Sequence, residues 1–293
     1  MYNIEEYFEP ETLAEALVIL TENPEAKLIA GGTDLLVNMQ HHPIKKERFL
    51  SIRKLKELQK IETHDDGTLS FGALVTLTQL FDDPFIKQNI PALSEAAMSM
   101  GGPQIRNIAT LGGNICNGAT SADSASTLFV LDAKLKIQSS KGERVVPIRE
   151  FYAGPGKVKL NQGEILTEIY IYPEDYEGFG GHYIKFAMRK AMDIATLGVS
   201  AACRIKEGRF DEVRIGLGVA GPTPLRCLEA EGYAQGKSPS KDTLLEIGKR
   251  AVRSTQARTS WRASKEYREH LVEELTQRAL NVAIQRAGGV YHV

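Results

Sequence analysis

Hydrophobic residues recur at helical spacing in several stretches of the chain. Leu13, Leu17 and Leu20 follow this spacing between Thr12 and an Asn-Pro pair. Because a Thr N-cap with Glu three residues further on forms a capping box, the pattern predicts an amphipathic helix over 13–21. The same spacing and boundary signals predict the remaining helices, which are 35–37, 78–81, 91–100, 242–252 and 266–286.

Strands are expected where apolar and polar residues alternate, or where short apolar runs lie between turn residues. Residues 134–139 and 144–148 alternate on either side of Lys141-Gly142, which predicts a hairpin. Residues 164–172 also alternate. The other expected strands are 27–30, 49–52, 68–73, 182–188, 199–205 and 212–219.

This order of elements predicts an α+β fold. Residues 1–175 are expected to form one domain, with a small α/β subdomain over about 1–55 and a second one over 56–175. Glycines 178, 180 and 181 mark a linker. Residues 180–288 are then expected to form a C-terminal domain, in which helices back a three-stranded antiparallel sheet.

Composition excludes several classes of function. The chain has 293 residues, of which 42% are hydrophobic and 25% charged, as in soluble globular proteins. Its net charge of -1 gives no field that would favour nucleic acid or an anionic membrane. The acidic N-terminus lacks the apolar core of a signal peptide, and no apolar run approaches the ~20 residues that span a bilayer. We therefore expect a cytoplasmic protein.

The cysteines predict no metal centre in this chain. Cys116, Cys203 and Cys227 are far apart, and no C-x-x-C pair occurs. Iron–sulfur clusters and structural zinc sites need several such ligands at short spacing.

Two glycine-rich stretches interrupt the regular pattern. They are 27–34 (KLIAGGTD) and 109–123 (ATLGGNICNGATSAD). Glycine allows a close backbone approach, and consecutive free N–H groups form anion-binding nests. The two stretches either hold a phosphate-bearing cofactor between them or are ordinary turns. Asp123 suits a ribityl or ribose hydroxyl, an N-cap for a helix starting near Ser124, or both.

Residues 216–221 (GLGVAG) match the dinucleotide-binding pattern G-x-G-x-x-G but lack its context. Pro222 and Pro224 follow at once, so no helix can present its N–H groups to a pyrophosphate. We expect instead that these glycines allow a strand end to pack closely.

Several charged residues have two interpretations. Lys185 lies on a predicted strand at the start of the second domain, where it faces either solvent or a cofactor held by the first domain. Asp193 is close enough in sequence to pair with Lys185 or Arg189. Arg106 either binds a phosphate or a partner subunit, or caps the helix that ends near Met100.

The sequence resembles the FAD-binding medium subunits of molybdenum hydroxylases, most strongly those of bacterial xanthine dehydrogenases. The resemblance covers essentially the whole chain. It rests on the two glycine-rich stretches and on four further motifs, which are 102–107 (GPQIRN), 185–194 (KFAMRKAMDI), 221–226 (GPTPLR) and 261–266 (WRASKE).

This resemblance implies a vanillyl-alcohol-oxidase-type FAD domain in two subdomains, followed by a C-terminal domain. It implies that 27–35 wraps the pyrophosphate and that 109–114 contacts pyrophosphate and flavin. It also implies that Lys185 lies against the isoalloxazine, which makes it the candidate catalytic residue. The implied FAD-binding residues are Lys27, Leu28, Ile29, Ala30, Gly31, Gly32, Thr33, Asp34, Leu35, Ile105, Ala109, Thr110, Gly112, Gly113, Asn114, Asn117, Asp123, Ile165, Leu166 and Lys185.

The resemblance also implies a function and partners. A large molybdopterin subunit would hydroxylate a purine, and a small [2Fe-2S] subunit would pass the electrons to FAD on this chain. NAD or another acceptor would then receive them, in a dimer of heterotrimers. The hydroxylated substrate could equally be another N-heterocycle, an aldehyde or carbon monoxide. One departure is Met100, which stands where eukaryotic relatives have an aromatic residue that stacks on the flavin.

Overall fold

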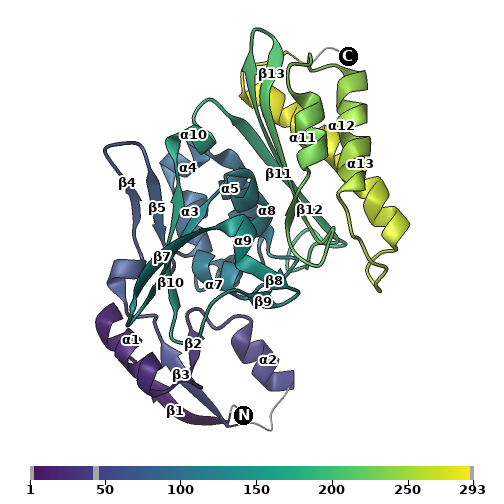
Figure 1. The fold of residues 1–293 in the computed structure, drawn as a ribbon. Helices are drawn as coiled ribbons and strands as arrows, with labels where there is room; N and C mark the ends of the chain where they lie inside the picture. Colours follow the sequence, from purple (N-terminus) through teal and green to yellow (C-terminus); the bar gives the residue numbers. More distant parts are fainter. Residues whose placement is uncertain (1–2, 42–45, 291–293) are drawn as a thin grey trace.

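A computed structural model describes residues 3–41 and 46–290, which fold into three sheets and a hairpin with helices packed around them (Figure 1). The first sheet is parallel, in the order β1-β3-β2, and carries the first of the glycine-rich stretches at the end of β2. Its elements are β1 (Ile4–Phe8), α1 (Leu13–Glu22), β2 (Lys27–Ile29), α2 (Leu35–His41) and β3 (Glu47–Ser51).

The second sheet is antiparallel, in the order β4-β5-β10-β6-β7. Its strands are β4 (Ile61–Thr63), β5 (Leu69–Gly72), β6 (Lys134–Ser139), β7 (Gly142–Pro147) and β10 (Ile165–Ile171). The helices around it are the 3-10 helix η1 (Lys56–Leu58) and the α-helices α3 (Leu77–Asp82), α4 (Pro84–Asn89), α5 (Pro91–Ser99), α6 (Pro103–Arg106), α7 (Leu111–Cys116), α8 (Asp123–Val130), α9 (Ile148–Phe151) and α10 (Pro173–Tyr176). A small hairpin, β8 (Tyr152–Gly154) with β9 (Lys157–Val158), follows α9.

The third sheet is antiparallel and carries the last helices. The three predicted strands are confirmed as β11 (Gly180–Phe186), β12 (Leu197–Lys206) and β13 (Arg209–Gly218), and a two-residue fourth strand, β14 (Leu225–Arg226), joins β13. The helices are α11 (Leu228–Ala234), α12 (Lys241–Arg253) and α13 (Lys265–Arg286). Their buried apolar residues form one core with this sheet, separate from the core around β5, β6 and β10.

Helix α8 joins the second and third sheets. All of its residues are buried, and it packs against α5 on one side and against β12 and β13 on the other (Figure 1). Gly216 makes this packing possible, because a Cβ there would lie 2.3 Å from the carbonyl oxygen of Ser126. The sequence-based interpretation that the 216–221 glycines allow a strand end to pack closely is therefore confirmed at Gly216.

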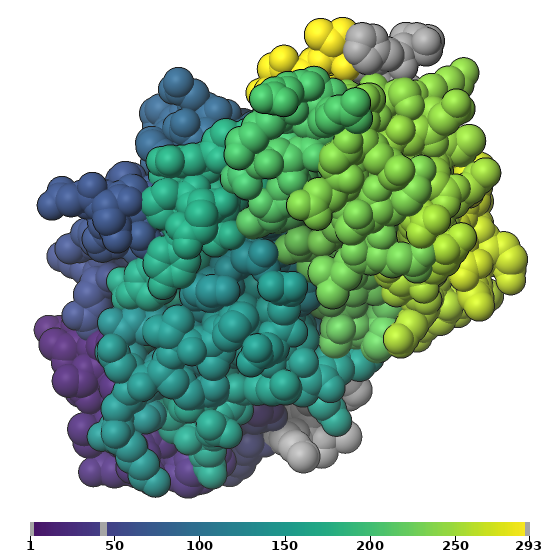
Figure 2. Space-filling view, turned by 45° about the horizontal axis from the view of Figure 1, so that its top comes forward, coloured from purple at the N-terminus to yellow at the C-terminus, as the bar shows by residue number. Residues whose placement is uncertain are grey.

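Two buried arginines fix the C-terminal end of α8 to the third sheet. Arg214 donates to the Val130 carbonyl and pairs with Asp175 at 2.8 Å, while Arg226 donates to the Phe129 carbonyl and pairs with Glu231 at 2.6 Å. Cations at a helix C-terminus stabilise it through the helix dipole. In the space-filling view the later part of the chain, in green, lies directly against the earlier part, in teal (Figure 2).

Candidate functional site

A cavity of about 540 Å³ lies where the two glycine-rich stretches meet β10 and β11. Its size falls in the range of pockets for small organic ligands. Nearly all of the residues implied by the resemblance line its wall, and only Lys27 does not: its side chain is exposed and pairs with Glu47 at 2.6 Å. The lining also includes residues that the sequence analysis had singled out without assigning them to the site, which are Met100, Cys116, Ala119, Ser121, Ala122, Asp193 and Ile194. Sequence reasoning missed Asn38, Ile52, Ala73, Leu77, Gly101 and Leu160.

Gly31 holds the two glycine-rich stretches together. A Cβ at this position would lie 2.2 Å from the carbonyl oxygen of Ile108, so only glycine allows this contact. Gly32 adopts a φ of +70°, which starts the turn into α2. These two requirements explain why both glycines are needed at the end of β2.

The turn from β2 into α2 presents free backbone donors. None of the N–H groups of residues 31–35 donates to an acceptor within 3–41 or 46–290, and the helix bonds begin with Leu36 N–H to the Gly32 carbonyl. Consecutive free N–H groups at the start of a helix bind anions such as phosphates. This stretch therefore fits the pyrophosphate of a dinucleotide.

The second stretch is more ordered than a loop. Residues 111–116 form α7, capped by the Thr110 hydroxyl, which accepts from Gly113 N–H at 3.1 Å. Leu111 N–H donates to the Val75 carbonyl and Gly112 N–H to the Ala73 carbonyl. The first N–H groups of α7 are thus already satisfied within the protein. Gly112 is closely packed, since a Cβ would lie 2.6 Å from Ala73 O, whereas Gly113 is exposed to the cavity.

A buried ion pair forms the opposite wall. Asp123 accepts from Lys185 Nζ at 2.8 Å and from the Tyr183 hydroxyl at 2.6 Å, and Lys185 also donates to the Ser99 carbonyl at 3.1 Å. The side chains of Asp123 and Lys185 are 6% and 11% exposed. Burial raises the pKa of Asp123, although Lys185 and Tyr183 oppose that shift.

The structure shows which groups of the protein these residues contact. Asp123 is the first residue of α8, but Ala122 is its N-cap and the carboxylate binds Tyr183 and Lys185. Asp193 pairs with Arg189. Arg106 donates to the Met100 carbonyl at 3.1 Å and so caps the end of α5.

The thiol of Cys116 also lines the cavity, beside α7. Burial raises its pKa to about 12, so it stays protonated and acts as a small apolar wall residue. Met100 is 6% exposed and contributes to both the cavity wall and the core beneath it. No group of three or more histidine, cysteine or acidic residues in the described parts of the chain could hold a metal ion.

Residues 2–173 match the family model described as the FAD-binding domain in molybdopterin dehydrogenase, and residues 182–283 match the CO dehydrogenase flavoprotein C-terminal domain. These two matches place the chain in the family of FAD-binding subunits of molybdenum hydroxylases. It is an FAD-dependent oxidoreductase subunit, and the free N–H groups of residues 31–35 and the size of the cavity fit that cofactor.

Within that family the chain is similar to xanthine dehydrogenase subunits. It is 46% identical to the xanthine dehydrogenase FAD-binding subunit of Escherichia coli O157:H7 over 289 residues, or 99% of each chain. It is 34% identical to the nicotinate dehydrogenase FAD-subunit of Eubacterium barkeri over 82% of each chain. The carbon monoxide dehydrogenase of Hydrogenophaga pseudoflava has the same fold, with a TM-score of 0.92 and 28% identity over 98% of this chain and 99% of that one.

Among residues 3–41 and 46–290 there is no helix long and apolar enough to cross a membrane.

Proposed function

We propose that this chain is the FAD-carrying electron-transfer subunit of a xanthine dehydrogenase-type molybdenum hydroxylase. It takes electrons from the [2Fe-2S] clusters of a partner subunit and passes them to NAD or another acceptor during purine hydroxylation. The observation that carries the proposal is a single cavity with free N–H groups of residues 31–35 on one wall and the Lys185–Asp123 pair on the other. Similarity to xanthine dehydrogenase subunits over the full chain supports the choice of hydroxylase.

The positions of residues in the cavity wall suggest which part of FAD each one binds. The turn 31–35 binds pyrophosphate through its backbone, and Gly113 and Asn114 leave room for the cofactor beside α7. Ile165 and Leu166 at the start of β10 form an apolar surface for the flavin ring. Bound FAD would supply the two-electron chemistry, and the protein would set its position and potential.

Lys185 is the residue proposed to act on that chemistry, because reduction adds negative charge to the flavin and a nearby cation stabilises it. We propose that Asp123 shares this role. Its carboxylate lies 2.8 Å from Lys185 Nζ and offsets part of the positive field. Tyr183 holds the carboxylate in place from its other oxygen.

The proposed organisation is one FAD-binding domain over residues 1–175 and a C-terminal domain over 180–288. The proposed assembly contains a large molybdopterin subunit and a small [2Fe-2S] subunit, with two such heterotrimers in the complex. The relatives support the subunit composition, since they include a carbon monoxide dehydrogenase medium chain from Hydrogenophaga pseudoflava. A nicotinate dehydrogenase subunit among the relatives keeps another N-heterocycle as the second candidate substrate.

Purification of the complex from its native host tests the proposal. We expect the chain to co-purify with molybdopterin and [2Fe-2S] subunits and to release FAD on denaturation. Xanthine should then bleach the flavin absorbance, and NAD should restore it. Bleaching by nicotinate, an aldehyde or carbon monoxide but not by xanthine would select the alternative substrate. A chain that oxidises purines without other subunits would contradict the proposal.

The cavity assignment has its own test in two matched variants. Gly113→Leu places a side chain in the cavity, where only the Thr110 hydroxyl lies within 4 Å of the new Cβ. Gly232→Leu adds the same side chain at an exposed helical glycine with nothing within 4 Å. We expect folded protein without FAD from the first and full FAD content from the second. Full flavin occupancy of Gly113→Leu would contradict the assignment.

A further inference from the structure

The segment between α12 and α13, together with the first turn of α13, carries positive charge that no described carboxylate neutralises. Arg258, Arg262 and Arg268 form no ion pair within the described chain. Other arginines of this half do pair with carboxylates, as Arg204 does with Asp211 and Arg250 with Glu246. We call Arg258, Trp261, Arg262 and Arg268 the arginine–tryptophan patch.

Arg268 is the buried member of the patch and senses the charges of the other two arginines. Burial, together with the charges of Arg258 and Arg262, lowers the pKa of Arg268. Arg268 is 2% exposed and donates to the Thr196 carbonyl and to the Ser260 hydroxyl at 2.8 Å. The Nε atoms of Arg262 and Arg268 are buried and have no hydrogen-bond partner in the part of the chain that the structure describes. Buried donors without a partner are costly. A bound molecule can reach Arg258, which is exposed, and Arg262, which is partly exposed.

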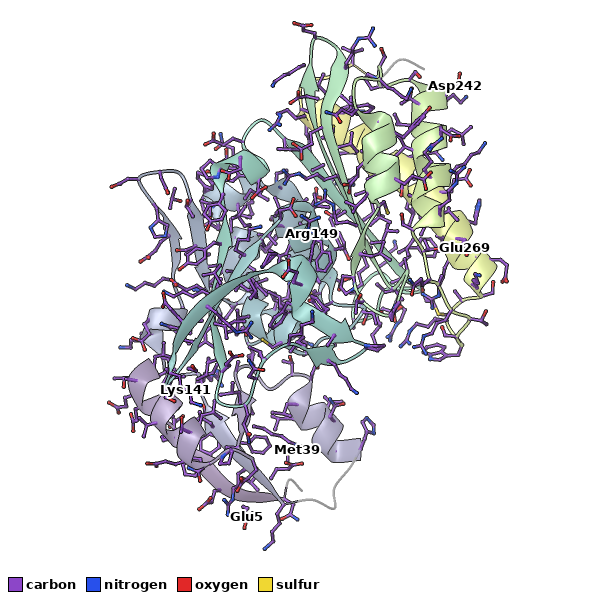
Figure 3. All side chains as sticks on the ribbon, in the orientation of Figure 1. Glu5, Met39, Lys141, Arg149, Asp242 and Glu269 are labelled. Atoms are coloured by element: carbon purple, nitrogen blue, oxygen red, sulfur yellow. The ribbon has the colours of Figure 1, made fainter. Side chains whose placement is uncertain are left out.

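Acidic side chains of the described residues near the patch have other partners. Glu269, labelled on α13 in Figure 3, pairs with Lys265 at 3.7 Å. Glu266 lies in the first turn of the same helix, where it interacts with Ser264 and with its own backbone. No carboxylate of residues 3–41 or 46–290 therefore pairs with the arginines of the patch.

Trp261 favours a protein segment over a small anion as the occupant of the patch. This single tryptophan of the chain is 77% exposed, and the Arg262 guanidinium stacks over its ring at 4.1 Å. An exposed aromatic ring beside arginines is the residue combination that dominates protein interfaces. A small anion would satisfy the charge but leave the ring in water.

The patch is coupled to the wall of the FAD cavity. Gln256, just before the patch, donates its N–H to the Ala220 carbonyl at 2.8 Å. The preceding residue, Val219, donates its N–H to the Thr120 carbonyl at 3.0 Å. Thr120 lies between two residues that line the cavity, Ala119 and Ser121. Arg268 binds the carbonyl of Thr196, two residues from the cavity residue Ile194. The segment protrudes at the lower right of Figure 1, at the N-terminal end of α13.

We propose that the arginine–tryptophan patch is the docking surface for a carboxylate-rich segment of a partner subunit. This inference rests on the proposed function, which supplies the partner. Guanidinium groups bind carboxylates through paired hydrogen bonds, and Trp261 becomes buried beneath the bound segment. Docking here places the partner against the backbone that forms one wall of the FAD cavity.

Charge reversal on the purified complex tests the proposal. Arg258→Glu and Arg262→Glu reverse charges at the patch, and Trp261→Ala removes the ring. Arg53→Glu is the matched control, because Arg53 is also exposed and forms no ion pair in the described chain. Each variant is co-expressed with its partner subunits, and subunit dissociation is measured by size-exclusion chromatography over a range of salt concentrations. FAD content reports on folding.

We expect the patch variants to weaken subunit association by at least about tenfold at full FAD content, with a smaller salt dependence for the charge reversals. Carbodiimide coupling should join the neighbouring Lys265 to an aspartate or glutamate of a partner subunit in the wild type. Association equal to that of Arg53→Glu would overturn the docking surface alone, and so would coupling of Lys265 only to a second copy of this chain. A wild-type chain that binds no other subunit would instead overturn the proposed function, and this inference with it.

Discussion

The Lys185–Asp123 ion pair leads to a prediction about the reduction potential of bound FAD. It compares two substitutions, each of which removes one member of the pair. Lys185 Nζ and Asp123 Oδ2 are 2.8 Å apart and both nearly buried. Lys185→Met removes the cation, and Asp123→Asn removes the anion with little change in shape. If the pair acts on bound FAD through its charges, the two variants should shift the reduction potential in opposite directions.

The magnitude follows from Coulomb's law. A negative charge at about 4 Å from Lys185 is attracted by about 4 kcal/mol at an effective dielectric of about 20. Asp123, one ion-pair length further away, repels the same charge by about 2 kcal/mol and leaves a net attraction of about 2 kcal/mol. In Lys185→Met no cation opposes the effect of burial, which raises the pKa of Asp123 and so favours its uncharged form.

For a two-electron couple these energies correspond to about 40 mV. We expect Lys185→Met to lower the midpoint potential by roughly that amount and Asp123→Asn to raise it by a similar amount. Spectroelectrochemical titration of the isolated flavoprotein measures both, with Lys249→Met as the control for an exposed cation on α12. Shifts of the same sign, or none in either variant, would refute the electrostatic reasoning.

Three further predictions follow from contacts around the cavity. Gly31→Ala should yield protein with little or no FAD, because its Cβ would meet the Ile108 carbonyl at 2.2 Å. Gly232→Ala is the control, because it has nothing within 4 Å of the Cβ and, like Gly31, no positive φ. Absorbance spectra measure the FAD content of both variants. Hydrogen bonds from Arg144, together with those from Asn161, lower the pKa of Glu164 to about 2. The Arg144–Glu164 pair therefore stabilises the fold fully at pH values above the unfolded pKa of about 4.3. This stabilisation disappears as the pH falls toward 2. Arg144→Gln should therefore remove about 1 kcal/mol at pH 7 after allowance for solvent screening, and the difference from wild type should shrink in urea titrations at low pH. Arg226→Met should cost about 3 kcal/mol or more of unfolding free energy, because it leaves the buried carboxylate of Glu231 unpaired; a loss below 1 kcal/mol in the same titrations would be inconsistent with a buried pair.

The periodicity of hydrophobic residues was sufficient to predict the helices and strands that bury one face. The helix predicted over 13–21 is α1 (Leu13–Glu22), and the hairpin predicted around Lys141-Gly142 is β6 and β7. Strand β1 (Ile4–Phe8) was not predicted, because most of its residues are exposed and its sequence, IEEYF, lacks an alternating pattern. It forms only because β3 supplies a parallel partner from more than forty residues away.

Helix α7 was missed for a different reason. Gly112 and Gly113 disfavour a helix, and local propensity therefore predicts a loop. The helix forms because Thr110 caps it and because Leu111 and Ile115 are fully buried in the core. Tertiary packing overrides propensity here, which a single sequence does not reveal.

The residues lining the site were largely predictable, but their pairing was not. The resemblance pointed to Asp123 and Lys185 separately. Nothing in the sequence indicates that these side chains, 62 positions apart, share one ion pair, or that Tyr183 completes it. Sequence also suggested free N–H groups in both glycine-rich stretches, whereas the structure leaves them free at residues 31–35 and uses those of Leu111, Gly112 and Gly113 internally.

The attachment of α8 to the third sheet has a consequence for how the cofactor is retained. Asp123 begins this helix and is held by Tyr183 and Lys185 of β11, while Arg214 and Arg226 hold its other end. Residues of the C-terminal half therefore hold α8 in place, although the part of the cavity wall at the start of α8 comes from the N-terminal half of the sequence. Flavin retention then reports on whether the two halves are docked, so a lesion far from the cavity, at the arginines behind α8, can produce colourless protein.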